Sequence, residues 1–167
     1  PDLPVKKGTA DMEVTASGSL NGGISAKGKI IINDLDFAIM DDGDTKSFSF
    51  ASLLLPFDAS YSESALKIPS FQVRGPGFTL DVSSRLDLVD RSNPHLSLSV
   101  KGEAMPVETF RRIFPSSLLP QWVDARLFPI FSGGQVRVDR FSLDGYLHQI
   151  GDLDLQENAG ALLLQLT

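Results

Sequence analysis

The sequence predicts a mainly β fold: a long, strongly twisted antiparallel sheet that forms a half-open groove or a sandwich, with a short helical insertion near residues 106–131. Apolar residues recur at every second position through most of the chain, the spacing that places them on one face of a strand. Most of these strands are half polar, which is typical of antiparallel sheets with one face in water. Only near residues 106–131 does the apolar spacing change to three and four, which is typical of helices.

The first part of the chain predicts long strands joined by tight turns. Met12, Val14 and Ala16 alternate with polar residues, and the turn Asn21-Gly22-Gly23 leads to a strand over 24–32. Apolar residues then continue at 35, 37 and 39 in the opposite parity, so we expect a bulge or kink at Asn33-Asp34. Residues 41–44 predict a hairpin turn.

Two prolines interrupt the strands of the middle part. The alternation over 53–61 contains Pro56, which favours an edge strand or an irregularity there. Pro69 separates two short strands, 66–68 and 71–73. Regular strands are expected over 78–88 and 96–100, joined by the turn at 90–94.

The helical insertion is expected to contain two short helices. Pro106 suits a first helical position, residues 115–117 separate the helices, and Gly133-Gly134 follow them. We expect Trp122 to pack the helices onto the sheet rather than to face a membrane or a partner. Strands resume at Val136, the segment 146–150 is ambiguous, and residues 153–155 and 162–166 are expected to be strands.

We expect one β-rich section of a larger protein, with strands over 1–104, the helical insertion over 105–131 and strands over 132–167. The chain of 167 residues begins at Pro1 and carries no signal peptide. Its strongest apolar run, at 161–166, is far too short to span a bilayer. The anchoring segment is therefore expected elsewhere in the parent protein.

Composition and motifs argue against several classes of function. The 15 basic and 21 acidic residues give a net charge of −6 without a basic stripe, so nucleic acid is not an expected partner. There is no cysteine to form a disulfide or a thiolate metal site. His95 and His148 are far apart in the sequence and are expected to be turn or surface residues, with no metal or cofactor bound. No catalytic motif is present, so we do not expect an enzyme.

The apolar face of the sheet has two interpretations. Packed against a second sheet, it is the core of a sandwich. Left open, it is a trough too large to expose without a lipid or protein to cover it. The residues expected to line such a trough are Met12, Val14, Ile30, Ile32, Phe37, Leu55, Phe57, Phe78, Leu80, Val82, Leu96 and Leu98.

The stretch from about Leu96 to Gly145 resembles the AsmA-like superfamily, and its YhdP-type members in particular. The resemblance rests on four strings: Met105-Pro106-Val107-Glu108, Leu118-Leu119-Pro120-Gln121-Trp122-Val123, Gly133-Gly134-Gln135-Val136 and Phe141-Ser142-Leu143-Asp144-Gly145. It implies a parent protein anchored in the inner membrane of a diderm bacterium and extending through the periplasm.

The same resemblance implies a function in lipid transport. AsmA-like proteins are similar to bridge-like lipid transfer proteins, whose rolled sheet carries a hydrophobic groove. The expected partners are therefore phospholipid acyl chains, with envelope proteins as further partners, and the expected role is phospholipid transport between the inner and outer membranes in outer-membrane biogenesis. The alternative is a structural or protein-interaction β-sandwich module of a cell-envelope protein, with a closed core.

Overall fold

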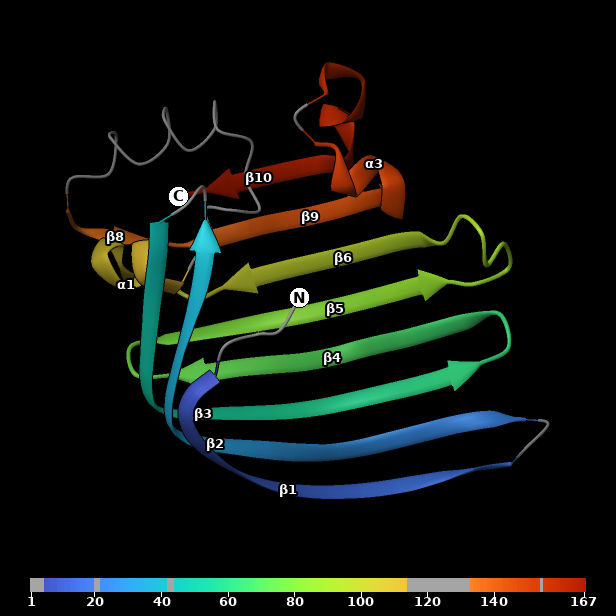
Figure 1. The fold of residues 1–167 in the computed structure, drawn as a ribbon, viewed down its shortest axis with the longest axis horizontal. Helices are drawn as coiled ribbons and strands as arrows, with labels where there is room; N and C mark the ends of the chain where they lie inside the picture. The colour runs from blue at the N-terminus through green and yellow to red at the C-terminus, as the bar shows by residue number, and fades with distance from the viewer. Residues whose placement is uncertain (1–4, 20–21, 42–43, 114–132, 154) are drawn as a thin grey trace.

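The computed structural model describes residues 5–19, 22–41, 44–113, 133–153 and 155–167. Its main element is one eight-stranded antiparallel sheet in the order β1-β2-β3-β4-β5-β6-β9-β10, which confirms the predicted fold class (Figure 1). In chain order the strands of this sheet are β1 (Val5–Ser19), β2 (Gly23–Asp41), β3 (Asp44–Ser62), β4 (Ala65–Gly75), β5 (Phe78–Asp87), β6 (His95–Gly102), β9 (Val138–Tyr146) and β10 (Leu162–Leu166). Within the described residues, β1 and β10 each have a paired neighbour on one side only, so the sheet is open.

The two longest strands bend together at Asp34. This residue has a φ of 51°, a conformation that Asp adopts more readily than most residues, and the register between β2 and β3 continues unbroken on both sides of it. Ile32 and Leu35 both pack against the core although three positions separate them. The predicted kink at Asn33-Asp34 is therefore confirmed. Beyond it, β2 and β3 turn across the ends of the neighbouring strands (Figure 1).

The prolines of the middle strands lie differently from the predictions. Pro69 does not separate two strands, because β4 is continuous and contains a bulge: Pro69 and Ser70 lie where β5 has only Ser83. The extra residue keeps Ile68 and Phe71 on the same face of the sheet, opposite Ser84 and Val82 of β5. Pro56 is not in an edge strand, since β3 lies between β2 and β4 and Pro56 is paired with Lys29. Of the two alternatives predicted for Pro56, the edge strand was wrong, and the nearest irregularity of β3 is its register shift with β4 between Asp58 and Ser60.

A short helix closes one end of the sheet. The pair β7 (Met105–Pro106) and β8 (Gln135–Val136) flanks α1 (Val107–Ile113), which has Glu108 in its first turn and two arginines in its last, as the helix dipole favours. Val107 and Phe110, three positions apart, face the sheet and are buried. Pro106 immediately precedes the helix instead of beginning it. The second predicted helix and Trp122 lie outside the described residues.

The C-terminal part is more helical than the sequence indicated. The ambiguous segment is mainly α3 (Leu147–Gly151), and the 3-10 helix η3 (Gln156–Ala161) leads into β10. The prediction of a strand at 153–155 was wrong at its two described residues, since Leu153 packs against the core and Leu155 is the residue at which η3 starts; Asp154 lies outside the described residues. The predicted strand at 162–166 is confirmed.

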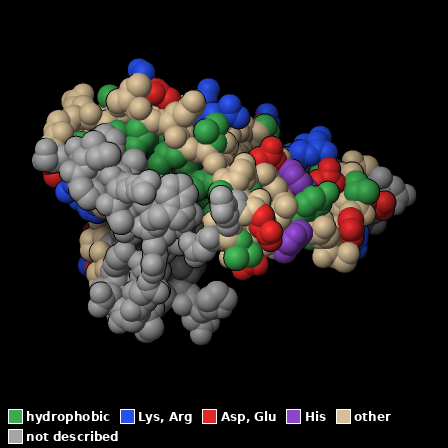
Figure 2. Space-filling view, turned by 90° about the horizontal axis from the view of Figure 1, so that it is seen from above, with side chains coloured by type: hydrophobic (Ala, Val, Ile, Leu, Met, Phe, Trp, Pro, Cys, Tyr) green, Lys and Arg blue, Asp and Glu red, His purple; other side chains and the backbone are tan. Residues whose placement is uncertain are grey.

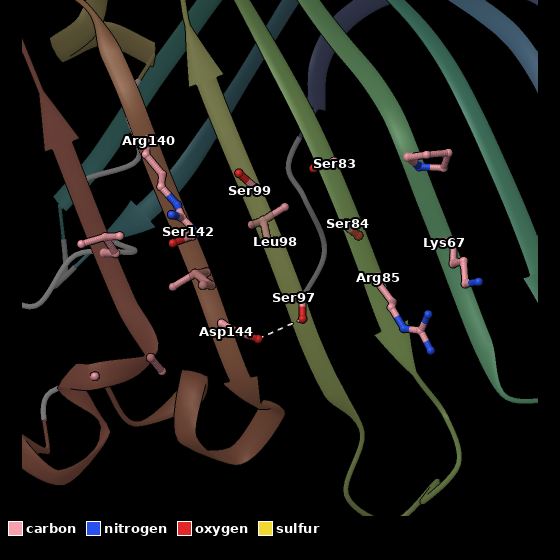
Figure 3. A pocket seen from close by; sticks show the side chains of 15 residues that line it. Lys67, Ser83, Ser84, Arg85, Ser97, Leu98, Ser99, Arg140, Ser142 and Asp144 are labelled. Carbon is pink, nitrogen blue, oxygen red and sulfur yellow. Dashed lines mark hydrogen bonds between the residues drawn. The ribbon is translucent and has the colours of Figure 1, made fainter.

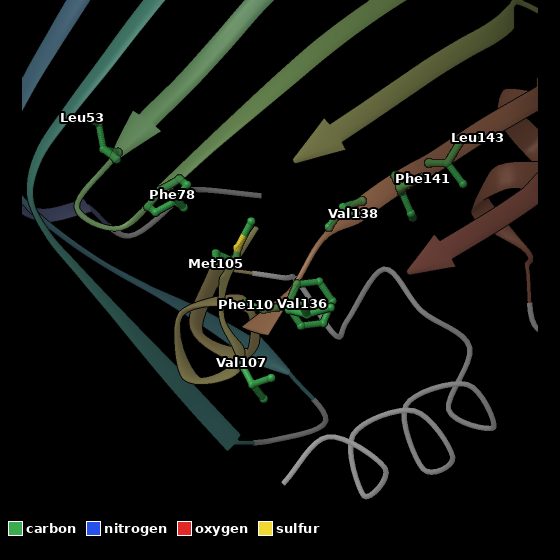
Figure 4. Packing of buried hydrophobic residues seen from close by; sticks show 9 residues of the cluster. All are labelled: Leu53, Phe78, Met105, Val107, Phe110, Val136, Val138, Phe141 and Leu143. Atoms are coloured by element: carbon green, nitrogen blue, oxygen red, sulfur yellow. The ribbon is translucent and has the colours of Figure 1, made fainter. Parts of the chain in front are cut away.

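The main hydrophobic core lies where α1 and the bent strands meet the sheet (Figure 4). Phe110 and Met105 are only 1% exposed, and the ring of Phe50 lies edge-on to that of Phe78 at 6.2 Å between centroids. The buried cluster consists of Leu53, Phe78, Met105, Val107, Phe110, Val136, Val138, Phe141 and Leu143. This cluster fixes α1 to the end of the sheet.

Phe110 has the largest side chain among the fully buried residues in the described part of the chain, and replacing it by alanine leaves a cavity under α1. We expect Phe110→Ala to lower the free energy of unfolding by about 3–5 kcal/mol, measured by urea denaturation followed by circular dichroism. The exposed Glu108→Ala in the same helix is the control and should change it by about 0.5 kcal/mol or less. A loss of under about 1 kcal/mol for Phe110→Ala would contradict the packing of α1.

Candidate functional site

One face of the sheet, here called the inner face, carries apolar rows that cross the strands. Residues directly opposite one another in an antiparallel ladder point to the same face. The register joins one such row through all eight strands: Val14, Gly28, Phe57, Phe71, Val82, Val100, Phe141 and Leu164. A second row runs from β1 to β9: Gly18, Ile24, Tyr61, Leu66, Leu86, Leu96 and Gly145. The inner face is therefore one continuous apolar surface.

The structure places the predicted lining residues in four groups. Phe78 belongs to the buried core, and the residues that pack against this core are Ile32, Leu55, Leu80 and Leu98. Half-buried positions between the core and the open end are held by Ile30, Phe57, Val82 and Leu96. Met12 and Val14 are exposed on β1, at the edge of the sheet. Phe37 lies beyond the bend, where its ring stacks on that of Phe50 at 6.2 Å.

Several inner-face residues were missing from the prediction. Phe71, Phe141 and Leu164 complete the row that crosses all eight strands, and Leu143 joins the buried core. Their alternation is visible in the sequence. The pairing of β9 with β6 is not, because 35 residues separate Gly102 from Val138 and no local pattern specifies where the chain returns.

Exposure along the inner face rises from the closed end to the open end. Near α1, Leu53 and Phe78 are each 7% exposed. On β1 and β2, Val14 is 41%, Ile24 54% and Met12 70% exposed. A hollow of about 680 Å³ lies at this open end, lined by Ala16, Gly18, Gly23, Ile24, Tyr61 and Glu63 among others. The inner face thus has a packed end and an end where apolar side chains meet water.

The opposite face, here called the outer face, is mainly polar, with apolar exceptions such as Leu54 and Leu163. Ser83, Ser99 and Ser142 lie side by side on β5, β6 and β9, within a shallow hollow of about 530 Å³ (Figure 3). The hydroxyl of Ser97 donates to Asp144 Oδ1 at 2.9 Å. Exposed ion pairs such as Lys29 with Glu13 also lie on this face, and pairs of this kind add little to stability. Water can therefore solvate the outer face without a partner.

Acidic residues mark one corner of the outer face. The backbone N–H of Val89 donates to Asp87 Oδ1, and the Arg85 guanidinium lies 3.1 Å from Asp87 Oδ2. These contacts hold the pKa of the Asp87 carboxyl below its usual value. The Ser92 hydroxyl and N–H likewise lower the pKa of Asp90. Both carboxylates are therefore charged at neutral pH.

The two histidines meet at the same corner, which the sequence did not indicate. The pairing of β6 with β9 sets His95 opposite Tyr146, and the rings of His95 and His148 lie against that of Tyr146 at 5.1 and 5.9 Å. His148 Nδ1 is 3.0 Å from Asn93 Oδ1. Both side chains are on the surface, as predicted, and Figure 2 shows them among acidic side chains.

The described residues hold no group of three or more His, Cys, Asp or Glu side chains that could bind a metal ion. None of the helices in the described part of the chain is both long and apolar enough to cross a bilayer. Comparisons with protein families, curated proteins and solved structures find no match. The inner face is therefore the candidate site on the strength of its geometry.

The gradient of exposure predicts a gradient of chemical reactivity. Because the chain has no cysteine, single substitutions report on one position each. Ile24→Cys should react with a maleimide dye in the native protein at nearly the rate of a free thiol, whereas Leu143→Cys, at a position 5% exposed, should react only after unfolding. The measurement is the rate of labelling with and without urea.

A control on the outer face separates exposure from local chemistry. Ser25→Cys, next to Ile24 on the same strand, is also exposed and should react as fast as Ile24→Cys. Protection of Ile24→Cys alone would contradict an open inner face.

Proposed function

We propose that the inner face binds lipid acyl chains, and that the chain is a periplasmic groove segment of an AsmA-like protein that supports phospholipid transport between the inner and outer membranes. The observation that carries the binding proposal is the apolar row through all eight strands, which ends in the exposed Val14. The AsmA-like resemblance supports the wider role, including an inner-membrane-anchored parent protein.

The energetics of the open end favour an apolar ligand. Met12, Val14, Ile24 and Tyr61 are exposed on the same face: Met12 and Val14 are neighbours on β1, Ile24 lies opposite Tyr61, and the paired Ala16 and Ala26 lie between the two groups. Contiguous apolar surface of this kind is covered in most soluble proteins. An acyl chain laid on it gains about 0.8 kcal/mol for each methylene that leaves water.

The chemistry of the inner face also predicts that the site does not recognise the lipid headgroup. Its rows contain few polar side chains; one is Ser84, opposite Leu98. Fixing a headgroup requires polar groups placed to hydrogen-bond it, and the charged residues beside the open end, such as Glu13 and Lys29, lie on the outer face. The headgroup would therefore stay in water at the rim. Movement of the lipid would be a slide along similar contacts, with no covalent step.

A structural module with a closed core is the second candidate, and one observation favours it. At the end covered by α1, inner-face residues such as Phe78 and Phe141 are packed as in any protein interior. If the whole inner face were covered in this way, no room would remain for an acyl chain. The two candidates differ in what binds to the open end.

A charge placed on the inner face should abolish acyl-chain binding. We expect Val82→Glu to weaken binding of a fluorescent fatty acid at least about tenfold, because a carboxylate in the trough must lose water when the chain binds. Ser83→Glu, the next residue of β5 on the outer face, is the matched control and should leave the affinity unchanged. Fluorescence titration measures the affinity, and circular dichroism checks folding.

A second pair of variants changes exposed residues instead of the half-buried Val82. Ile24→Glu should weaken binding without loss of stability, since Ile24 is already 54% exposed, whereas Ser25→Glu should not. If the purified protein carries no lipid in native mass spectrometry, binds no fatty acid, and Leu80→Asp unfolds it, the closed-core candidate is correct and the proposal fails.

A further inference from the structure

Among the described residues, the outer edge of β1 is long and has no strand beside it. Of the described strands, only β2 pairs with β1, and the pairing is regular from Thr9 to Ser19. Natural sheets usually protect such an edge with a proline, a bulge or a charge that points inward. The segment Thr9–Ser19 has no proline, and the irregularities of β1 lie before Thr9. Its carboxylates, Asp11 and Glu13, lie opposite Ile31 and Lys29 on the outer face.

The apolar side chains of this edge lack cover on one side. Met12 and Val14 belong to the inner face, yet they are 70% and 41% exposed. Within the part of the chain that the structure describes, β1 is the last strand of the inner face and still carries its apolar pattern. One more strand on this edge would supply both hydrogen bonds to the backbone and neighbours to these side chains.

We propose that β1 pairs antiparallel with β1 of a second copy of the chain, about a twofold axis at Val14. An axis perpendicular to the sheet keeps both inner faces on the same side. In this register Met12 lies opposite Ala16 of the second copy, and Val14 lies opposite itself. The whole regular segment pairs with itself, since Thr9 lies opposite Ser19.

Charge distinguishes this register from its neighbours. An axis at Asp11, Met12 or Glu13 would set acidic side chains directly opposite one another, which destabilises a sheet. With the axis at Val14, Glu13 lies opposite Thr15 and Asp11 opposite Ser17, so each carboxylate meets a hydroxyl. An axis at Ala10 would require pairing of the irregular residues before Thr9. An axis at a residue after Val14 would pair fewer residues of the regular segment.

Symmetry favours the pairing of β1 with β1 over the pairing of β1 with β10 of a second copy. Pairing of β1 with the short β10 of a second copy would leave the same two edges free and would continue without closing. Pairing of β1 with itself closes at two copies and joins the two inner faces into one apolar surface. The proposal depends on the edge alone and holds whether or not the inner face binds lipid.

Sedimentation and crosslinking of the whole chain test the pairing. We expect a species of twice the 18.1 kDa chain mass that dissociates on dilution. Val14→Cys should be linked to a dimer by a short bismaleimide, because its two copies face each other with Cβ atoms about 4.5–5.5 Å apart. Ala10→Cys, on the same face of the same strand, is the control: its two copies lie about 27 Å apart at about 3.4 Å per residue and should not be linked.

A repulsive substitution completes the test. Val14→Lys sets two ammonium groups opposite each other and should raise the dissociation constant about tenfold or more. Ile24→Lys places the same charge on β2 and should leave it unchanged. A monomer at all concentrations, assemblies that grow beyond two copies, or equal linking of the Val14→Cys and Ala10→Cys chains would each overturn the proposal.

Discussion

The inner face depends on one geometric constraint: side-chain alternation must stay in phase across eight strands. A strand has a period of two, so an extra residue sends every later side chain to the other face. Two irregular places in the middle of the sheet show how the chain meets this constraint. The bend at Asp34 returns Leu35 and the residues after it to the core, and the bulge at Pro69 and Ser70 keeps Phe71 in line with Phe57 and Val82.

The bend at Asp34 also shapes the groove. A bend shared by β2 and β3 carries their distal halves across the end of the sheet, where Phe50 packs on Phe78. The helix α1 fills the same end with Val107 and Phe110. One end of the inner face becomes a protein core, which stabilises the sheet. The other end remains apolar and exposed, and the candidate lipid site lies there.

The sequence predicted the parts of this structure that local patterns determine. Alternation revealed the strands, their half-polar character and the inner-face residues from Met12 to Leu98. It also revealed the kink, because the parity change after Ile32 is visible in the sequence itself. The start of α1 followed from the change to helical spacing at Val107 and Phe110.

What the sequence could not predict depends on contacts between distant segments. The return of β9 beside β6 brings His95 to Tyr146 and completes the apolar row with Phe141. No sequence pattern in either strand indicates that the two strands pair. Pro69 suggested a break because a proline cannot donate to the ladder, and only the register shows that a bulge absorbs it. The contact of Leu153 with the core could not be predicted from periodicity, because it is a single apolar residue outside any strand or helix.

The most direct test of the account is paramagnetic broadening by a fatty acid that carries a nitroxide in its acyl chain. With the leucine and valine methyl groups labelled for NMR, we predict broadening of Leu55, Val82 and Leu98 on the inner face. Leu54 and Leu163, which lie opposite Arg74 and Ser142 on the outer face, should remain sharp. Equal broadening of both sets, or none at all, would contradict an acyl-chain site on the inner face.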